Sequence, residues 1–506
     1  MPKNISLCVA AAVLLASPYL FPLLFPLAWI AFVPFFRVVQ QAEGFRRGIF
    51  FGWLTGFLAN LFGFHWLIYT ISVFGGFSYP VSSIVFLVYA ALQGVQMALF
   101  AVVFRGCGLG PANVIPALFW IVLEFWFPML FPWYLANSQV SFTAFIQSAD
   151  LVGPYAASLL LMWFNATAYD LVASWKQGRR IRWEAAAGVV LLVFGSIVYG
   201  VWRKDAIAEE MAAAPKLRVA AVQGNIDIDL KWNPIQARRN LQVHQDLTAG
   251  ISGTTLLIWP ESAVEFWLPE KLQELPAEVK PSLKSENAYF IFGAKSFAGR
   301  PGGPDFRAFN TAFLADGKGR VLSRYHKQVL LAFGEYLPFA GILSKLPAIP
   351  FADGFTPGDG PHTFSLSGGA YRIAPLICYE DLMPELSRGF VRDTKANLLV
   401  NLTNDAWYGR TVAPWQHARL AQWRAVETRR TLLRVTNTGV TSIINAKGEM
   451  MQTLPTFAPA VLEAEVEILE GDTLYVRFGD WFAWSITFVA MTTVLLRLWA
   501  AKARET

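Results

Sequence analysis

The chain has 506 residues, of which 55% are hydrophobic and 15% are charged. This composition is too apolar and too poor in charge for a soluble protein of that size, so it indicates a membrane protein. The formal net charge of +6 does not indicate nucleic-acid binding, because many of the basic residues stand in short loops between apolar runs, where they orient a chain in a membrane.

The first apolar run, residues 6–36, is longer than the roughly 20 residues that one membrane helix requires. Pro18, Pro22 and Pro26 interrupt it, so we predict two short spans joined by a tight hairpin. Further runs predict spans near residues 48–70, 82–104, 113–130, 154–174, 185–202 and 481–499. The expectation is about eight spans, with a helical domain at residues 1–203 and a last helix with its tail at 481–506.

The basic residues predict how these spans are oriented. They gather after the first apolar block, at Arg105, between Lys176 and Arg182, and from Arg497 to the end of the chain. The loops "GGFSYP" and "FPWYLANSQVSFTAFIQSAD", by contrast, carry almost no charge. If both ends of the chain are cytoplasmic, the positive-inside rule places residues 204–480 outside the cytoplasm.

A transporter, or a scaffold whose outer domain only binds a ligand, is the alternative from a different class. Transporters place ionisable groups near the middle of the membrane or show repeated halves. Glu124 and His65 are the best candidates for such groups, but a structural role near an interface explains each of them better. No repeated halves are evident in the sequence.

Residues 204–480 have the composition of a globular domain. Strands are predicted at "LRVAAVQGNI", "TTLLIWPES", "AYFIFGAKS", "NTAFLAD", "YRIAPLICYE", "ANLLVNLTND" and "TLLRVTNTGVTSIINAKG", and helices at residues 234–251 and 413–430. Many of these strands are apolar without alternation, which is typical of sheets that are covered on both faces. The pattern therefore predicts a layered α/β domain.

Polar residues stand near the ends of several predicted strands, where α/β folds commonly place their sites. Glu261 ends "LLIWPES", Lys327 and Glu335 lie in "SRYHKQVLLAFGEYLP", and Cys378 lies in "PLICYED". A thiol becomes a better nucleophile beside a base and a cation. Glu261 would take the thiol proton and Lys327 would stabilise the oxyanion, which is the arrangement for acyl transfer through a thioester.

A Cys–His pair stays open as an alternative at this point. His326 precedes Lys327, and His244, His362 and His417 lie elsewhere in the domain. On an extended strand, however, His326 points away from the side that carries Lys327, so Glu261 is the preferred base. The three cysteines are far apart and show no metal-ligand spacing, so they predict neither a disulfide framework nor a metal site.

These residues carry a resemblance to a known family. In chain order, Glu261, Lys327 and Cys378 resemble the Glu-Lys-Cys triad of the nitrilase, or carbon-nitrogen hydrolase, superfamily. The motifs "VQGNI", "LKWNP", "WPES", "FGEYLP", "CYED" and "NLTNDAWYG", placed between membrane spans, resemble the apolipoprotein N-acyltransferase family. The resemblance covers essentially the whole chain and implies that the domain is a four-layer α-β-β-α sandwich.

The resemblance also implies an activity. An N-acyltransferase of this family lies in the bacterial inner membrane, which would place residues 204–480 on the periplasmic side. Such an enzyme moves a fatty acyl chain from a phospholipid, typically phosphatidylethanolamine, onto its cysteine. It then passes the chain to the α-amino group of diacylglyceryl-cysteine on an apolipoprotein, in a ping-pong mechanism. The family requires no metal, nucleotide or other cofactor, and a monomer is the simplest assembly. A membrane-anchored amidase or nitrilase-like hydrolase, in which water resolves the acyl-enzyme, is the alternative.

Carried over by motif, Glu261 matches the general base, Lys327 the oxyanion stabiliser and Cys378 the nucleophile. Glu335 matches a supporting glutamate that would orient Lys327 or assist proton transfer. Trp232 and Asn310 match further positions needed for activity or substrate placement. Tyr379 and Glu380 match the positions next to the nucleophile, where support of the site by packing is the alternative to a direct role in catalysis.

The segment after Glu335 predicts contact with lipid. Residues 338–355, "PFAGILSKLPAIPFADGF", form an apolar stretch rich in Gly and Pro with one lysine. It would either cover the core of the domain or dip as an arm into the boundary between the lipid headgroups and the acyl chains.

Overall fold

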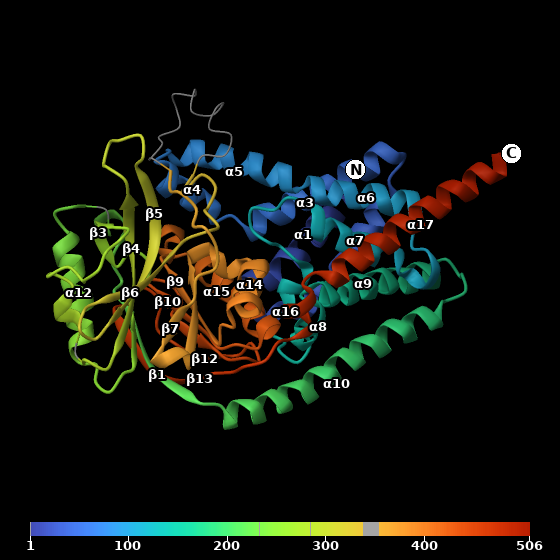
Figure 1. The fold of residues 1–506 in the computed structure, drawn as a ribbon. Coiled ribbons are helices and arrows are strands. Elements are labelled where there is room, and N and C mark those ends of the chain that lie inside the picture. Colours follow the sequence, from blue (N-terminus) through green and yellow to red (C-terminus); the bar gives the residue numbers. More distant parts are fainter. Residues whose placement is uncertain (1, 232, 284, 337–353, 506) are drawn as a thin grey trace. The chain divides into compact units, whose positions relative to one another are not determined.

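The computed structural model describes residues 2–231, 233–283, 285–336 and 354–505. Contacts within the chain divide it into two compact units. The helical unit comprises Met1–Ile68, Pro80–Asp205 and Phe478–Thr506, and the sheet unit comprises Tyr69–Tyr79 and Ala206–Arg477. Figure 1 shows the helices and strands of both units.

Helices stand wherever the sequence predicts a span. They are α1 (Pro2–Leu20), α2 (Phe32–Gln41), α3 (Phe45–Gly63), α4 (Leu67–Gly75), α5 (Tyr79–Gln93), α6 (Val95–Cys107), α7 (Ile115–Trp126), α9 (Tyr155–Lys176), α10 (Trp183–Ala213) and α17 (Trp481–Glu505). A short helix outside the predicted spans, α8 (Ala149–Val152), precedes α9. The predicted hairpin is real, because the chain leaves α1 at Phe21, which has an extended backbone, and re-enters a helical turn, η1 (Pro22–Trp29), at Pro22.

Length and composition qualify some of these helices, but not all of them, as membrane spans. In the described residues five helices could cross a membrane: Pro2–Leu20, Pro22–Gln41, Tyr79–Cys107, Tyr155–Lys176 and Trp183–Ala213. The pair α3 and α4, bent by 69°, would make a sixth, while Pro111–Trp126 and Trp481–Arg497 are apolar but shorter. The count of about eight spans therefore stays a prediction.

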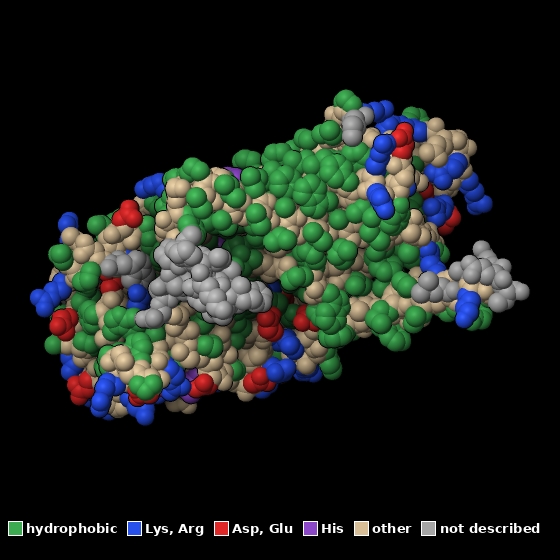
Figure 2. Space-filling model, turned by 90° about the horizontal axis from the view of Figure 1, so that it is seen from above, with side chains coloured by type: hydrophobic (Ala, Val, Ile, Leu, Met, Phe, Trp, Pro, Cys, Tyr) green, Lys and Arg blue, Asp and Glu red, His purple; other side chains and the backbone are tan. Residues whose placement is uncertain are grey.

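The exterior of the helical unit is apolar. Figure 2 shows hydrophobic side chains gathered over one face of it, with Lys and Arg side chains toward one end. Large side chains on its long helices are more than half exposed, among them Leu191 and Phe194 of α10 and Phe488 of α17. Soluble proteins do not expose apolar surface continuously on this scale, so these faces are suited to lipid, and the protein is a membrane protein.

Three of the four basic clusters of the sequence meet within the helical unit. Arg105, at the end of α6, donates to the carbonyl of Val39 at 2.6 Å. Arg497 of α17 donates to the carbonyl of Cys107 at 3.0 Å. Arg182 donates to the loop that follows α6. These contacts bring the basic loops to a common end of the unit, as the positive-inside rule requires of loops on one side of a membrane.

The two intramembrane candidates for a transport path have structural roles. Glu124 is buried and accepts hydrogen bonds from Trp120 Nε1 at 2.7 Å and from the Leu135 amide at 2.5 Å. It therefore ties α7 to the loop that follows it. His65 is exposed and lies 2.9 Å from the Phe62 carbonyl, in the bend between α3 and α4.

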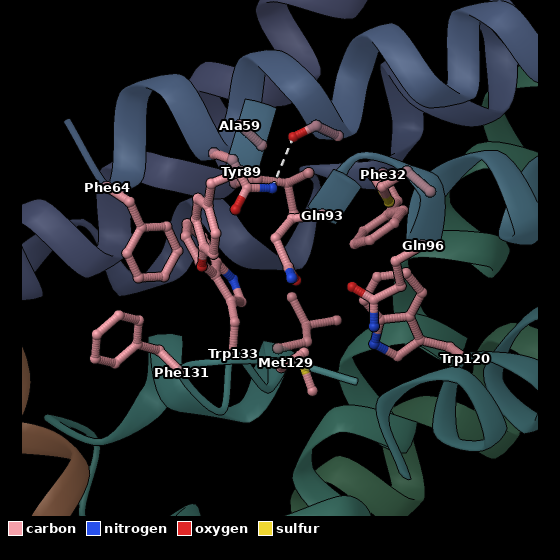
Figure 3. A pocket seen from close by; sticks show the side chains of 15 residues that line it. Phe32, Ala59, Phe64, Tyr89, Gln93, Gln96, Trp120, Met129, Phe131 and Trp133 are labelled. Carbon is pink, nitrogen blue, oxygen red and sulfur yellow. Dashed lines mark hydrogen bonds between the residues drawn. The ribbon is translucent and has the colours of Figure 1, made fainter. Parts of the chain in front are cut away.

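A small pocket lies inside the helical unit. Figure 3 shows that the amide ends of Gln93 and Gln96 reach into it, between Trp120 on one side and Phe131 and Trp133 on the other. Its volume is about 40 Å³. A water molecule needs roughly 10–15 Å³ by this measure, so the pocket can hold a few waters but no acyl chain.

The sheet unit contains two sheets. Its strands are β1 (Lys216–Gln223), β2 (Leu256–Ile258), β3 (Val264–Pro269), β4 (Tyr289–Ala298), β5 (Arg307–Asp316), β6 (Val321–His326), β7 (Phe364–Leu366), β8 (Tyr371–Ile377), β9 (Leu398–Thr403), β10 (Leu432–Thr436), β11 (Ser442–Ile444), β12 (Met450–Thr453) and β13 (Ala460–Glu467). The first sheet has the order β13-β1-β2-β4-β5-β6, with β3 beside β4, and the second has the order β12-β11-β10-β9-β8-β7. All the predicted strands are present.

Helices cover the outer face of each sheet. The helices of this unit are α11 (Ile228–Lys231), α12 (Ala237–Ala249), α14 (Pro384–Thr394), α15 (Ala413–Thr428) and α16 (Leu474–Phe478). Helix α12 packs on β1 and β3, α14 packs on β8, and α15 packs on β10, while β1 and β5 of the first sheet contact β10 and β8 of the second. Figure 1 shows the resulting α-β-β-α layers, and the predicted sandwich is confirmed.

Strand direction brings the predicted site residues to one edge. In the first sheet β2 and β4 are parallel, and two antiparallel steps through β5 make β6 parallel to them as well. The segments that follow β2 and β6 therefore leave the sheet at the same edge, carrying Glu261 and Lys327. In the second sheet β8, β9 and β10 are parallel, and Cys378 follows β8 directly.

Candidate active site

Cys378 stands at a sharp turn between β8 and the short helix η7 (Cys378–Leu382). Its φ of 53° lies in the left-handed region, which a non-glycine residue adopts only when the surroundings enforce it. Asn401 of β9 contributes by donating to the Cys378 carbonyl at 2.9 Å. The residue is 8% exposed, so the turn presents the thiol in a nearly dry environment.

Glu261 lies in a tight turn after β2, seated against β4. A Cβ on Gly293 would come within 2.7 Å of the Glu261 Cα, so only glycine allows the turn to lie this close. One carboxylate oxygen of Glu261, Oε1, accepts a hydrogen bond from Asn310 Nδ2 at 2.7 Å. The other, Oε2, is buried and has no hydrogen-bond partner among the described residues, which leaves it available to accept a proton.

Lys327 is a buried cation held by a second carboxylate. Its Nζ donates to Glu335 Oε2 at 2.6 Å, and its side chain is 1% exposed. The same Glu335 oxygen accepts from the Leu331 amide at 2.9 Å. Asn310 Nδ2 also donates to Glu335 Oε1 at 2.9 Å, so this one amide joins the two glutamates that flank the cation.

Burial and mutual charge set the protonation states. Burial and then the charge of Glu261 raise the pKa of the Cys378 thiol, and Lys327 only partly opposes them. Burial also raises the pKa of Glu261, against the lowering effect of Lys327. For Lys327, burial lowers the pKa, but Glu335, Cys378 and Glu261 together outweigh it and hold the pKa above its ordinary value. At neutral pH the site therefore combines a protonated thiol with a charged lysine.

Glu380 joins the nucleophile to the segment that follows the cation. Its carboxylate accepts from the Ile377 amide at 2.8 Å, next to Cys378, and from the Gln328 amide at 2.7 Å, next to Lys327. It also accepts from the Tyr325 hydroxyl at 2.9 Å. Burial raises its pKa to about 7, against the opposing charge of Lys327. This geometry fits support of the site rather than contact with substrate.

Of the remaining predicted residues, the structure describes Asn310 and Tyr379 at the site but does not describe Trp232. Asn310 contacts both Glu261 and Glu335, as described above. Tyr379 is buried in the same turn as Cys378. Trp232 lies outside the described residues, as do residues 338–353 of the predicted lipid arm.

Three of the four histidines considered as an alternative base have partners elsewhere, and the fourth, His362, is exposed. His326 Nδ1 lies 2.8 Å from the Thr311 hydroxyl. His244 Nδ1 lies 2.9 Å from the Asn240 carbonyl on α12. His417 is held between two aspartates. Glu261 exerts the largest charge effect on the pKa of Cys378, and its role as the base stays a prediction. The described residues contain no group of three or more His, Cys, Asp or Glu side chains that could hold a metal ion.

A buried ionic network supports the turn that carries Cys378, and sequence reasoning missed it. His417 of α15 lies between Asp381 of η7, at 2.8 Å, and Asp405 of η8 (Asp405–Tyr408), at 3.0 Å. Arg434 of β10 donates to the same two aspartates, each at 3.1 Å. Because the four side chains come from four separate elements, no pattern in the sequence predicts their meeting.

Removal of Arg434 should destabilise the sheet unit strongly. In Arg434→Met, Asp381 and Asp405 lose the cation that compensates their burial, and the expected loss in the free energy of unfolding is about 3–5 kcal/mol. The measurement is denaturant unfolding in detergent. Arg320→Met is the matched control, because Arg320 pairs with Asp316 at the surface, where a pair is worth about 0–1 kcal/mol. Equal effects of the two substitutions would refute the role of the network.

Comparisons with known proteins agree on one family. Two family models match, carbon-nitrogen hydrolase over residues 218–470 and the N-terminal domain of apolipoprotein N-acyltransferase over residues 11–167. The apolipoprotein N-acyltransferase of Geobacter metallireducens is 33% identical, covering 96% of this chain and 93% of its own. That of Pseudomonas aeruginosa is 30% identical, covering 95% and 92%. A crystal structure of an amidase from Nesterenkonia sp. is 22% identical with a TM-score of 0.35, covering 52% of this chain and 92% of that one.

Proposed function

The chain belongs to the apolipoprotein N-acyltransferase family, and from that premise we propose how it transfers an acyl group to a lipoprotein. The donor is a phospholipid, phosphatidylethanolamine in the first place. The acceptor is the N-terminal amine of diacylglyceryl-cysteine on an apolipoprotein. Cys378 carries the acyl chain between the two as a thioester, and the products are a lysophospholipid and a triacylated lipoprotein.

One observation carries this proposal: a thiol, a carboxylate with a free oxygen and a fixed cation converge in one buried site. Glu261 and Lys327 both act electrostatically on Cys378. Oε2 of Glu261 has no hydrogen-bond partner among the described residues, and Glu335 fixes Lys327. Acyl transfer needs these three functions at the same moment, namely a nucleophile, a proton acceptor and a positive charge for the oxyanion.

In the first half-reaction the Cys378 sulfur attacks the ester carbonyl of the donor. Because the raised pKa of the thiol disfavours a free thiolate, its proton passes to Glu261 as the S–C bond forms. Lys327 stabilises the charge that develops on the carbonyl oxygen. The ester C–O bond then breaks, and Glu261 returns the proton to the departing alkoxide of the lysophospholipid.

In the second half-reaction the neutral amine of the acceptor attacks the thioester carbonyl. The N–C bond forms, Glu261 takes a proton from the amine, and Lys327 again holds the oxyanion. The S–C bond breaks and the proton returns to sulfur, which restores the resting thiol. Glu335 and Glu380 take no part in the bond changes and hold Lys327 and the Cys378 turn in place.

We further propose the domain organisation and orientation. Residues 1–203 and 481–506 anchor the chain in the bacterial inner membrane, and residues 204–480 form the catalytic domain on the periplasmic side. The contacts among the basic loops of the helical unit support a cytoplasmic location for that end. A monomer suffices, because one chain supplies every group that the mechanism uses.

Trapping the acyl-enzyme tests this function against hydrolysis. When purified protein is incubated with phosphatidylethanolamine vesicles, mass spectrometry should find one fatty-acyl adduct on Cys378, because the low exposure of the site excludes water. The adduct should persist until a diacylglyceryl-cysteine peptide is added and should then appear on the amine of the peptide. Release of free fatty acid without an acceptor would identify a membrane-anchored hydrolase instead. Absence of both products would contradict the phospholipid donor.

A further inference from the structure

Lys231 is a buried lysine that the mechanism above does not use. It ends α11 in the motif "LKWNP" and is 0% exposed. Its Nζ donates to the carbonyl of Ser262 at 3.0 Å. Burial of an ammonium group costs several kcal/mol unless its environment compensates, so a lysine is retained here at an energetic cost.

The carbonyl that Lys231 holds belongs to the turn of Glu261. Ser262 follows Glu261 directly and has a φ of 52°, again in the left-handed region. On one side the turn rests on Gly293, whose missing Cβ allows the close approach. On the other side Lys231 holds the Ser262 carbonyl. Two contacts from separate elements thus fix a strained turn whose only ionisable side chain is that of Glu261.

The charge of Lys231 also reaches this carboxylate. It lowers the pKa of Glu261, in the same sense as Lys327 and the Asn310 hydrogen bond, while burial and Glu335 raise that pKa. Burial lowers the pKa of Lys231 itself to about 8, against the opposing charges of Glu265 and Glu261. The other titratable groups on which Lys231 acts are Glu265 of β3, Lys295 of β4 and His244 of α12.

We propose that Lys231 is a positioning residue for acyl transfer, which holds the Glu261–Ser262 turn so that the free oxygen of Glu261 faces the thiol proton. The inference rests on the proposed role of Glu261 as the base. It assigns Lys231 no contact with either substrate. Its loss should therefore slow proton transfer during acylation and leave binding of the donor unchanged.

The test is Lys231→Met, which keeps the length of the side chain and removes both the donor and the charge. Formation of the acyl-enzyme from phosphatidylethanolamine in mixed micelles should slow by about 10- to 100-fold, as losses of supporting hydrogen bonds do at other sites, with KM for the donor unchanged. Because the charge of Lys231 lowers the pKa of Glu261, the acidic limb of the pH profile should move to higher pH in the variant. Lys231→Arg retains the charge, so the acidic limb of its pH profile should stay in place. Its rate of acyl-enzyme formation should lie between the rates of the unsubstituted protein and of Lys231→Met.

Lys295→Met is the matched control, because Lys295 is a half-buried lysine of β4 whose charge acts on Glu265, whereas the groups that shift the pKa of Glu261 are Lys327, Glu335, Asn310 and Lys231. Its pH profile should be unchanged. If Lys231→Met lowers the midpoint of thermal unfolding but leaves the acidic limb of the pH profile in place, Lys231 has only a structural role, and the inference is overturned. If Lys231→Met is not recovered folded, an unchanged rate in Lys231→Arg overturns it. Glu261→Gln distinguishes failure of this inference from failure of the proposed function. Normal acylation in Glu261→Gln would refute the role of Glu261 as the base, on which the proposed function depends.

Discussion

Cys378→Ala should abolish N-acylation while the protein stays inserted and folded. The substitution removes the atom that carries the acyl chain, and no second thiol is available, since the other two cysteines, Cys8 and Cys107, lie in the helical unit. In acyl-transfer triads, loss of the nucleophile lowers kcat on the order of 10⁶-fold, which places the expected activity below detection. The measurement combines acyl-adduct mass spectrometry with N-acylation of a diacylglyceryl peptide.

Cys107→Ser is the matched control for this experiment. It also removes a free thiol, but from the end of α6, and should leave both half-reactions unchanged. Thermal unfolding of both variants checks that the sheet unit is intact. Retention of N-acylation by Cys378→Ala would reject the thioester and with it the whole mechanism. Loss of activity in both variants would point to a general effect of substitution instead.

Glu261→Gln should stop formation of the acyl-enzyme, the second largest effect that we expect. Glutamine keeps the shape of the side chain and an oxygen that can accept from Asn310, but it cannot take the thiol proton. Positioned general bases contribute about 10²- to 10⁴-fold. The effect should lie at the upper end, because the raised pKa of Cys378 leaves little thiolate to react without a base.

The pH profile distinguishes loss of a base from loss of packing. Burial raises the pKa of Glu261, so in the unsubstituted protein acylation should fall on acidification at a higher pH than an ordinary glutamate would cause. In Glu261→Gln that limb should disappear from the residual activity. Glu270→Gln is the control, since Glu270 pairs with Arg324 at 3.3 Å and is not among the groups that shift the pKa of Glu261 or of Cys378. An intact acidic limb in Glu261→Gln would assign the base to another group.

Local sequence patterns predicted the strands and helices of the sheet unit well. Runs such as "YRIAPLI" and "LLVNLT" contain β-branched and other apolar residues without alternation, so the pattern alone indicated that both faces of these strands are buried. The number of spans was harder to predict. The apolar run at residues 48–70 is one segment in the sequence, but the folded chain bends by 69° between α3 and α4, because a bend depends on packing as well as composition.

The active site was likewise predictable in part from the sequence and in part only from the tertiary structure. Residue type and chain order by themselves determined that a thiol, a lysine and the carboxylate of Glu261 follow separate strands, and the family resemblance suggested their roles. Only the tertiary structure decided that Asn310 joins Glu261 to Glu335, that Glu380 ties the Cys378 turn to the segment after Lys327, and that a buried ionic network supports this turn.

The physical reason is the distance along the chain over which each effect acts. Hydrophobic periodicity and turn preferences are properties of neighbouring residues, so a sequence states them directly. Hydrogen bonds such as that of Lys231 to Ser262, and the pKa values that burial and charge determine, depend on groups from different elements that meet only after folding. The sequence by itself thus determined which chemical groups this protein has, and the folded chain decided which of them act on one another.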